Sequence, residues 1–199
     1  DIVLLGLFAS LEDVGIYRVA AQVAGLGGFG YVALNIVASH QFSHFKSRND
    51  PVGAQHVAVF LCILALLSSL ILPVILMLGG PPMVAFVFGT SFKPAYEPML
   101  VLAIGQIVCA GCGMSNVLLL MHDREKLVAK LTGTFLVINV FLCIILIPGF
   151  GGLGAAWASV ISMAGWNVTT ATFAVRQTGI NTSILAISHR FPQIFLKVH

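Results

Sequence analysis

Long stretches without any charged residue dominate the chain and predict membrane-spanning helices. Four windows hold no Asp, Glu, Lys or Arg: residues 19–45, 51–92, 98–122 and 131–175, which are 27, 42, 25 and 45 residues long. A helix that crosses the roughly 30 Å hydrocarbon core of a bilayer needs about 20 apolar residues. The first and third windows therefore fit one span each, and the other two must be subdivided.

Proline and glycine clusters divide the two long windows. Pro148-Gly149-Phe150-Gly151-Gly152 interrupts the last window, because proline cannot continue a helix and glycine permits turn dihedrals. Gly79-Gly80-Pro81-Pro82 ends the helix of the second window, and residues 83–88 beyond it are too short to cross, which predicts a re-entrant or interfacial turn. The predicted elements are a truncated helix at 1–10, five full spans near 14–42, 52–78, 95–121, 125–147 and 153–175, and a tail over 176–199.

Composition agrees with an all-α membrane protein, a polytopic helical bundle. The chain is 58% apolar and 9% charged, with a mean hydropathy of +1.01, whereas soluble domains carry about 25% charged residues. The ten Lys and Arg form no basic block that would bind nucleic acid. The four cysteines all lie in apolar runs, which argues against a disulfide framework. The chain starts without an initiator Met or a signal peptide, so we expect a piece of a longer protein that lacks its N-terminal half.

The positive charges gather on one side of the predicted topology. Six helical pieces joined by short loops alternate sides, which places Arg18 and Lys93 on one side. The opposite side receives the other eight basic residues: Lys46, Arg48, Arg124, Lys126, Lys130, Arg176, Arg190 and Lys197. Cytoplasmic loops carry the excess of Lys and Arg. The pattern therefore predicts a cytoplasmic C-terminus and a cytoplasmic tail, whose apolar and basic residues are typical of an amphipathic interfacial helix.

Polar side chains at membrane depth are the candidate substrate-path residues. They are Arg18, Gln22, Asn35, Gln106, Asn116, Asn139 and Asn167. Such side chains usually face the bundle interior or a wet cavity. For each Asn and Gln, two interpretations stay open: a hydrogen bond between helices that fixes packing, or the lining of a polar path. Arg18 either extends to the membrane interface or faces a cavity and attracts an anionic group.

Other motifs predict packing and no chemistry. Small residues repeat at four-residue spacing, which lets helix backbones approach closely. The three sets are Gly105, Cys109 and Gly113; Gly151, Ala155 and Ser159; and Gly154, Ala158 and Ser162. The C-x-x-C motif at 109–112 lies in an apolar helix without a neighbouring cation, and the His40 and His44 pair lacks a third metal ligand. No acidic residues cluster inside a span. The sequence therefore predicts no catalytic residue, no metal site, no cofactor and no enzyme.

Several stretches together resemble the C-terminal half of a bacterial polysaccharide flippase. They are Asp1-Ile-Val-Leu-Leu-Gly6, Asp13-Val-Gly-Ile-Tyr17 with Ala20, Ala33-Leu-Asn35, Phe88-Gly89 with Phe92, Ala95 and Leu100, Gly105-Gln106, and Leu146-Ile-Pro148 with Gly151 and Gly154-Ala-Ala156. Over nearly the whole chain, this set is similar to the oligosaccharide-flippase (O-antigen translocase) family of the multidrug/oligosaccharidyl-lipid/polysaccharide exporter superfamily. The resemblance implies one six-helix lobe, with its first helix truncated, of a two-lobe transporter that works by alternating access.

The same resemblance implies a function and partners. The expected substrate is a polyprenyl-diphosphate-linked oligosaccharide, such as an O-antigen or another cell-surface polysaccharide unit, moved from the cytoplasmic to the periplasmic leaflet of the bacterial inner membrane. Lipids and the missing N-terminal half are the other expected partners. Two alternatives stay open: a cation-coupled multidrug or metabolite antiporter, for which Asp1 is the only acid at a predicted span, and a non-transporting membrane subunit or lipid-modifying enzyme.

Overall fold

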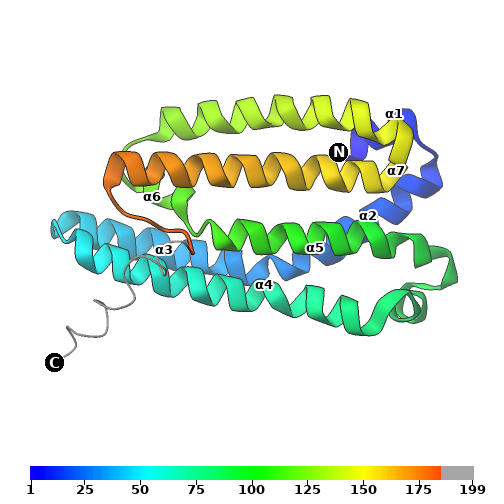
Figure 1. The fold of residues 1–199 in the computed structure, drawn as a ribbon, viewed down its shortest axis with the longest axis horizontal. Coiled ribbons are helices and arrows are strands. Elements are labelled where there is room, and N and C mark those ends of the chain that lie inside the picture. Colours follow the sequence, from blue (N-terminus) through cyan, green and yellow to red (C-terminus); the bar gives the residue numbers. More distant parts are fainter. Residues whose placement is uncertain (185–199) are drawn as a thin grey trace.

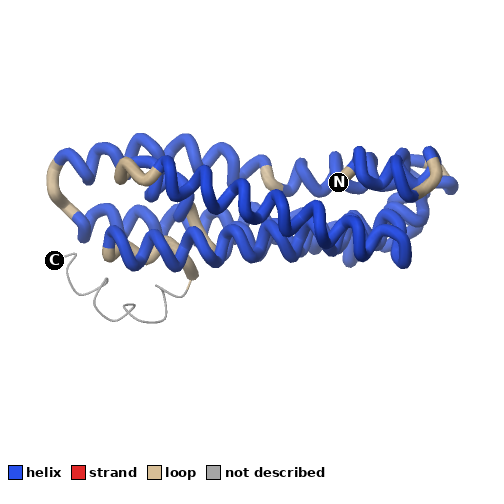
Figure 2. The backbone as a smooth tube through the Cα atoms, turned by 90° about the horizontal axis from the view of Figure 1, so that it is seen from above, coloured by secondary structure: helices blue, strands red, loops and turns tan. Residues whose placement is uncertain are grey.

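The computed structural model describes residues 1–184, and this part of the chain forms helices and no strand (Figure 1, Figure 2). The predicted tail covers residues 176–199: residues 176–178 end α7, residues 179–184 are not helical, and residues 185–199 lie outside the described residues. The helices are α1 Ile2–Phe8, α2 Leu11–Gly27, α3 Phe29–Ser47, α4 Pro51–Phe88, α5 Tyr96–Gly111, α6 Ser115–Met121 and α7 Glu125–Thr178, with a 3-10 helix, η1, at Thr90–Ala95.

The long helices lie roughly parallel to the longest axis of an elongated bundle (Figure 1). α5 packs against α2, α4 and α7, and α3 packs against α4 and α6. α7 turns back on itself at Gly151, where φ is 54°. Its first leg, residues 125–150, and its second leg, residues 152–178, therefore run side by side in opposite directions (Figure 1).

α2 and α3 are one apolar stretch bent by 45° at Gly28. A capping box starts α2: Ser10 Oγ accepts from the Asp13 backbone N–H at 3.1 Å, and the Asp13 carboxylate accepts from the Ser10 N–H at 3.3 Å. At the bend the helix lies so close to α4 that a Cβ on Gly27 would lie 2.9 Å from Leu72 Cδ2. The single span predicted over 14–42 is thus a bent pair that begins at Leu11 and ends at Ser47.

α4 extends further than the sequence indicates. Its N-terminus is capped by Asp50, whose Oδ1 accepts from the Gly53 N–H at 2.8 Å. The helix is interrupted at Gly80, with φ 57° and ψ −167°. A second short helix then runs to Phe88, so residues 83–88 are helical where a turn was expected. The reason is that Pro81 and Pro82 are compatible with the first turn of a helix although they cannot continue one.

The prediction of one helix over 95–121 is wrong at its centre. α5 ends at Gly111, α6 begins at Ser115, and Gly113 between them has φ 67°. This stretch holds no proline beyond Pro98, and its local helix-ending signal is Gly113, a left-handed glycine directly after the C-cap of α5. Contacts from residues distant in the chain hold the break.

The hairpin of α7 is tightly closed. The first and second legs approach so closely that a Cβ on Gly154 would overlap the backbone carbonyl of Leu146. Ala155, Ala156 and Ala158 beside it are fully buried. On the far side, the second leg contacts α5, where a Cβ on Gly105 would lie 2.7 Å from Val160 Cγ2. Small residues thus allow three helical segments to pack at short distance.

The surface of the bundle is suited to lipid. Three helical stretches are long and apolar enough to cross a membrane: Pro51–Phe88, Thr90–Gly111 and Glu125–Thr178, or four when the bent α2–α3 pair counts as one span. Large apolar side chains point outward, among them Phe86 at 91% exposure and Leu78 at 85%. In water such a surface would promote aggregation. The chain is therefore an all-α membrane protein.

Candidate functional site

Polar side chains meet where α1, α2 and both legs of α7 come together. Ser159 Oγ on the second leg lies 2.8 Å from Asp1 Oδ2 and 3.4 Å from the hydroxyl oxygen of Tyr17 on α2. One turn further along, Asn139 Nδ2 on the first leg donates to Ser162 Oγ at 2.9 Å. These five residues form the polar cluster of the bundle.

The two parts of the polar cluster are linked through Cys143. Its Sγ lies 3.8 Å from Asp1 Oδ1 and 3.9 Å from Asn139 Oδ1. Tyr17 is 2% exposed and Cys143 is fully buried. Asn139 and Ser159 are half-buried and Asp1 is exposed, so the cluster runs from the interior of the bundle to its surface. The exposed carboxylate of Asp1 accepts a hydrogen bond from Ser159 at this surface end.

A groove of about 400 Å³ lies beside the polar cluster, between the two legs of α7. Trp166 Nε1 at its edge is buried and has no hydrogen-bond acceptor among the described residues. The lining combines four polar residues of the cluster with a mostly apolar wall: Asp1, Asn139, Ser159 and Ser162, and Thr132, Phe135, Leu136, Met163 and Trp166. The groove is thus amphipathic, with its polar groups concentrated where α1 begins.

The other candidate residues predicted from the sequence do not join this cluster. Arg18 and Gln22 are exposed on α2, one turn apart on the same face. Asn35 bonds to the carbonyl of Tyr31 in its own helix at 2.8 Å. Gln106 lies at the α2–α3 bend, where its Oε1 would be 3.1 Å from a Cβ on Gly28. The structure therefore keeps Arg18 and Gln22 together on α2 and places Asn35 and Gln106 at separate points.

The two remaining asparagines lie inside the bundle. Asn167 is 4% exposed and donates to Cys109 Sγ at 3.2 Å and to the Met163 carbonyl at 2.9 Å, so it joins the second leg of α7 to α5. Asn116 Oδ1 is buried without a donor within residues 1–184. Of the seven predicted residues, only Asn139 belongs to the polar cluster.

Sequence reasoning missed most of the polar cluster. Ser159 and Ser162 occur in a repeat of small residues that predicts packing, and Tyr17 is part of a family resemblance without an assigned role. A signal was present, because both serines lie on the helix that follows the predicted hairpin and its partner leg carries Asn139. The register between the two legs, which brings Asn139 to Ser162, is set by the hairpin tip and is not visible in either leg alone.

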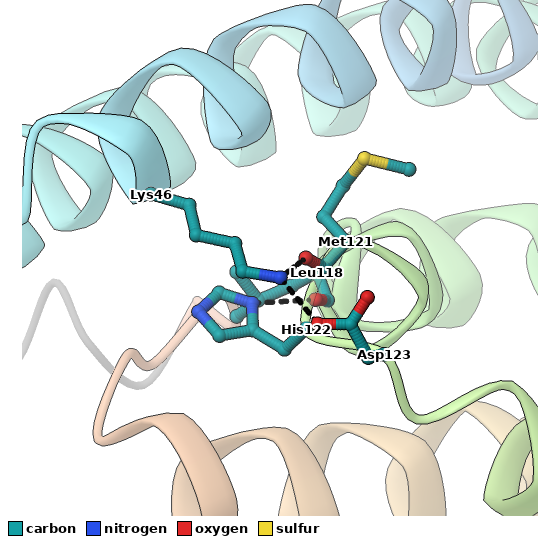
Figure 3. A network of polar contacts seen from close by, with 5 residues as sticks. All are labelled: Lys46, Leu118, Met121, His122 and Asp123. Atoms are coloured by element: carbon teal, nitrogen blue, oxygen red, sulfur yellow. Dashed lines mark hydrogen bonds and ion pairs between the residues drawn. The ribbon is translucent and has the colours of Figure 1, made fainter.

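A second polar network lies at the end of the bundle where α3 and α6 finish (Figure 3). Lys46 Nζ donates to the Met121 carbonyl at 2.6 Å and to Asp123 Oδ2 at 2.6 Å. His122 Nδ1 lies 2.9 Å from the Leu118 carbonyl. An ammonium at the last carbonyls of α6 is favoured by the helix dipole. The network thus joins the last turn of α3 to the end of α6 and the loop after it.

The ion pair of this network is expected to depend on pH. The Lys46 ammonium holds the pKa of Asp123 below its ordinary value of 3.8, first through the hydrogen bond and then through its charge. A lowered folded-state pKa contributes stability above pH 3.8, and this stability is lost as the pH falls through the folded-state pKa. The Asp123→Asn variant should therefore melt slightly below the wild type at neutral pH, and the difference should shrink below pH 3.8. The effect is small because the pair is exposed.

Thermal melting of the detergent-solubilised chain across pH measures this effect. Glu125→Gln is the matched control, since Glu125 is exposed two residues away and makes no ion pair among the described residues. A Glu125→Gln variant with the same pH-dependent difference would contradict the assignment to the Lys46–Asp123 pair.

Groups that would hold a metal ion are not assembled in the part of the chain that the structure describes. No three His, Cys, Asp or Glu side chains come together within residues 1–184. The four cysteines are buried free thiols, and His40 and His44 are both exposed on α3. What the structure does assemble is the polar cluster beside an amphipathic groove.

Comparison with known proteins gives one informative similarity. The chain is 26% identical over 166 residues to a protein of the archaeon Haloferax volcanii named as a probable low-salt glycan biosynthesis flippase, Agl15. The match covers 82% of this chain and 35% of that protein, so the chain spans about a third of the length of this relative. No family model matches the chain, and no solved structure does.

Proposed function

We propose that the chain forms part of a transporter that moves a lipid-linked glycan across a membrane. The observation that carries this proposal is the similarity to a flippase of glycan biosynthesis along 82% of the chain, together with a helical bundle whose surface is suited to lipid. A sugar headgroup is too polar to cross the hydrocarbon unaided. A protein that moves it must provide polar groups at membrane depth, and the bundle contains such groups.

The substrate we propose is a polyprenyl-diphosphate-linked oligosaccharide, an O-antigen or another cell-surface unit. Amides and hydroxyls such as those of Asn139 and Ser162 bind sugar hydroxyls through hydrogen bonds, and a guanidinium such as that of Arg18 binds phosphate through two parallel ones. Arg18 and Gln22 are both exposed on α2, so they are free to face a path outside this bundle. The wall of that path would come from a second lobe.

We further propose that this bundle is one lobe of two and works by alternating access. A relative about three times as long as the matched segment leaves room for a second lobe of similar size. Two lobes that rock about a site near the midplane of the bilayer expose it alternately to each side. The excess of Lys and Arg at the ends of α3 and α7 and in the loop before α7 supports a cytoplasmic position for that end of the bundle, in the bacterial inner membrane.

A second candidate function is cation-coupled antiport of a drug or metabolite. The observation that favours it is the carboxylate of Asp1, which lies in the polar cluster at 2.8 Å from Ser159 Oγ. Ionisable side chains inside a membrane protein often mark ion or proton pathways. The same cluster thus fits either function, and transport must be measured to separate them.

The test is a leaflet-translocation assay with the full-length parent protein in liposomes. One set of liposomes contains a polyprenyl-diphosphate oligosaccharide in one leaflet, and a parallel set contains a cationic dye under a Na⁺ or H⁺ gradient. The proposal expects the lipid-linked sugar to change leaflet and the dye to stay. Gradient-driven movement of the dye without sugar transfer would assign the protein to the antiporters, and movement of neither would overturn both functions.

A further inference from the structure

The break between α5 and α6 differs from the interruptions at Gly80 and Gly151, which have proline nearby. Pro81 and Pro82 follow the break at Gly80, and Pro148 lies three residues before the break at Gly151. Residues 99–121 contain no proline. Gly113, directly after the C-cap of α5, has a left-handed φ and is the local signal that ends the helix. Contacts from elsewhere in the fold then supply donors to the carbonyls that the break frees.

The chain after α7 supplies such contacts. Gly179, with φ 72°, ends α7, and residues Ile180–Ile184, which we name the strap, run from there to the α5–α6 break. The side-chain amide of Gln55 on α4 holds the backbone of Asn181 on both sides: Nε2 donates to the Asn181 carbonyl at 2.6 Å, and Oε1 accepts from its N–H at 2.7 Å. Thr182 is 1% exposed and Ile180 5%, so these two side chains of the strap are buried in the bundle, whereas Ile184 at its end is exposed.

The strap and its neighbours occupy the carbonyls that a continuous helix would use. In such a helix the carbonyls of residues 111–113 would accept from the N–H groups of residues 115–117. Instead, the Gly111 carbonyl accepts from the Ile184 N–H at 2.8 Å. The Cys112 carbonyl accepts from Ser115 Oγ at 2.8 Å and Thr182 Oγ1 at 3.2 Å. The Gly113 carbonyl accepts from the Tyr31 hydroxyl at 3.3 Å. No carbonyl freed by the break is left without a donor.

Gly113 is adapted to the broken form. Its φ of 67° is a left-handed value that glycine adopts without strain. A Cβ at this position would overlap the Thr182 carbonyl of the strap. In a continuous helix the same position would take ordinary helical dihedrals, which alanine favours over glycine. Alanine at position 113 would therefore destabilise the broken arrangement and stabilise the continuous helix.

We propose that α5 and α6 form a two-state element whose state is set by the strap. With the strap seated, the helix is broken and the strap supplies the missing hydrogen bonds. With the strap released, residues 111–117 form the internal bonds of one continuous helix. Straightening moves α6, and with it the Met121 carbonyl and Asp123, which bind Lys46 of α3. The strap thus couples the end of α7 to the end of α3, whether or not the protein transports a glycan.

Hydrogen exchange of the full chain in lipid nanodiscs tests this proposal with Gly113→Ala. The amides of Ser115, Asn116 and Val117 should exchange roughly tenfold more slowly than in the wild type, since they gain helical acceptors. The amides of Asn181 and Ile184 should exchange roughly tenfold faster, since they lose theirs. Gly111→Ala is the matched control, because a Cβ there meets only Leu66 Cδ2 at an ordinary 3.8 Å. It should leave both groups of amides unchanged.

Thr182→Val is the second variant, which removes one hydroxyl from the strap without adding bulk. As in Gly113→Ala, exchange should become slower at residues 115–117 and faster at residues 181 and 184. The control Thr172→Val, at an exposed threonine that bonds within its own helix, should change exchange in neither group. If the Gly113→Ala variant loses protection from hydrogen exchange throughout α4, that variant has not folded. The result for Thr182→Val then decides whether the proposal holds. Faster exchange at 181 and 184 without slower exchange at 115–117 would overturn the proposal, because release of the strap would then leave the helix broken.

Discussion

Replacing Gly154 with valine is expected to destabilise the bundle strongly. A Cβ at 154 would overlap the Leu146 carbonyl and lie 3.1 Å from the Ile147 backbone nitrogen. These neighbours are backbone atoms of the opposite leg of α7, which cannot rotate away as the end of a flexible side chain can. Overpacking of a close contact costs about 1–3 kcal/mol, and valine adds two further methyl groups. We expect a loss of about 3 kcal/mol or more and a melting temperature lower by roughly 5–10 °C.

Melting of the detergent-solubilised chain measures the effect of Gly154→Val. The matched control is Gly133→Val on the first leg of α7, where a Cβ would meet nothing within 4 Å. The control should melt close to the wild type, because its new side chain points into open space. Equal loss of stability in both variants would show that valine acts through its low helix propensity. The two legs of α7 would then be further apart at Gly154 than in the structure.

The closure of the hairpin also explains why the polar cluster exists. Asn139 lies on the first leg, and Ser159 and Ser162 lie on the second. Their hydrogen bonds need the two backbones close together and in one register, which Gly154 and the buried Ala155 allow. A variant that separates the legs should therefore lose the cluster as well as stability.

The sequence predicts those features of the fold that are encoded locally. Charge-free windows locate the apolar stretches, and proline with glycine locates the interruptions near Gly80 and Gly151. In each case the residues that cause the break lie beside it. The hairpin of α7 is an example, since Pro148 and four nearby glycines end one leg and begin the next.

Features that depend on residues distant in the chain could not be predicted in this way. At the α5–α6 break, the freed carbonyls of Cys112 and Gly111 accept hydrogen bonds from Thr182 and Ile184, about 70 residues further along. The polar cluster likewise joins Tyr17 to Ser159 across 142 positions. Periodicity describes one helix at a time, so it identifies Asn139 as a polar residue at membrane depth but gives no partner for it.

Arg18 carries the largest expected effect on transport. It is exposed on α2, with the buried Tyr17 of the polar cluster directly before it and Gln22 one turn further on. The one ion pair within residues 1–184 joins Lys46 to Asp123, so Arg18 has no carboxylate partner there. As the eighth residue of α2, it lies roughly 10 Å from the start of that helix. A guanidinium in this position is free to bind a diphosphate.

Replacing Arg18 with alanine should therefore lower the rate of lipid-linked sugar transfer at least tenfold in the full-length parent protein, since a charge-assisted contact with the diphosphate is lost. Insertion and melting temperature should stay unchanged, because the side chain is exposed on α2. Arg18→Lys should keep part of the rate, since the ammonium retains the charge but not the paired hydrogen bonds. Arg176→Ala, at an exposed arginine in the last turn of α7, should transport as the wild type does. Wild-type transfer by Arg18→Ala would mean that this side chain extends to the membrane interface and takes no part in binding the substrate.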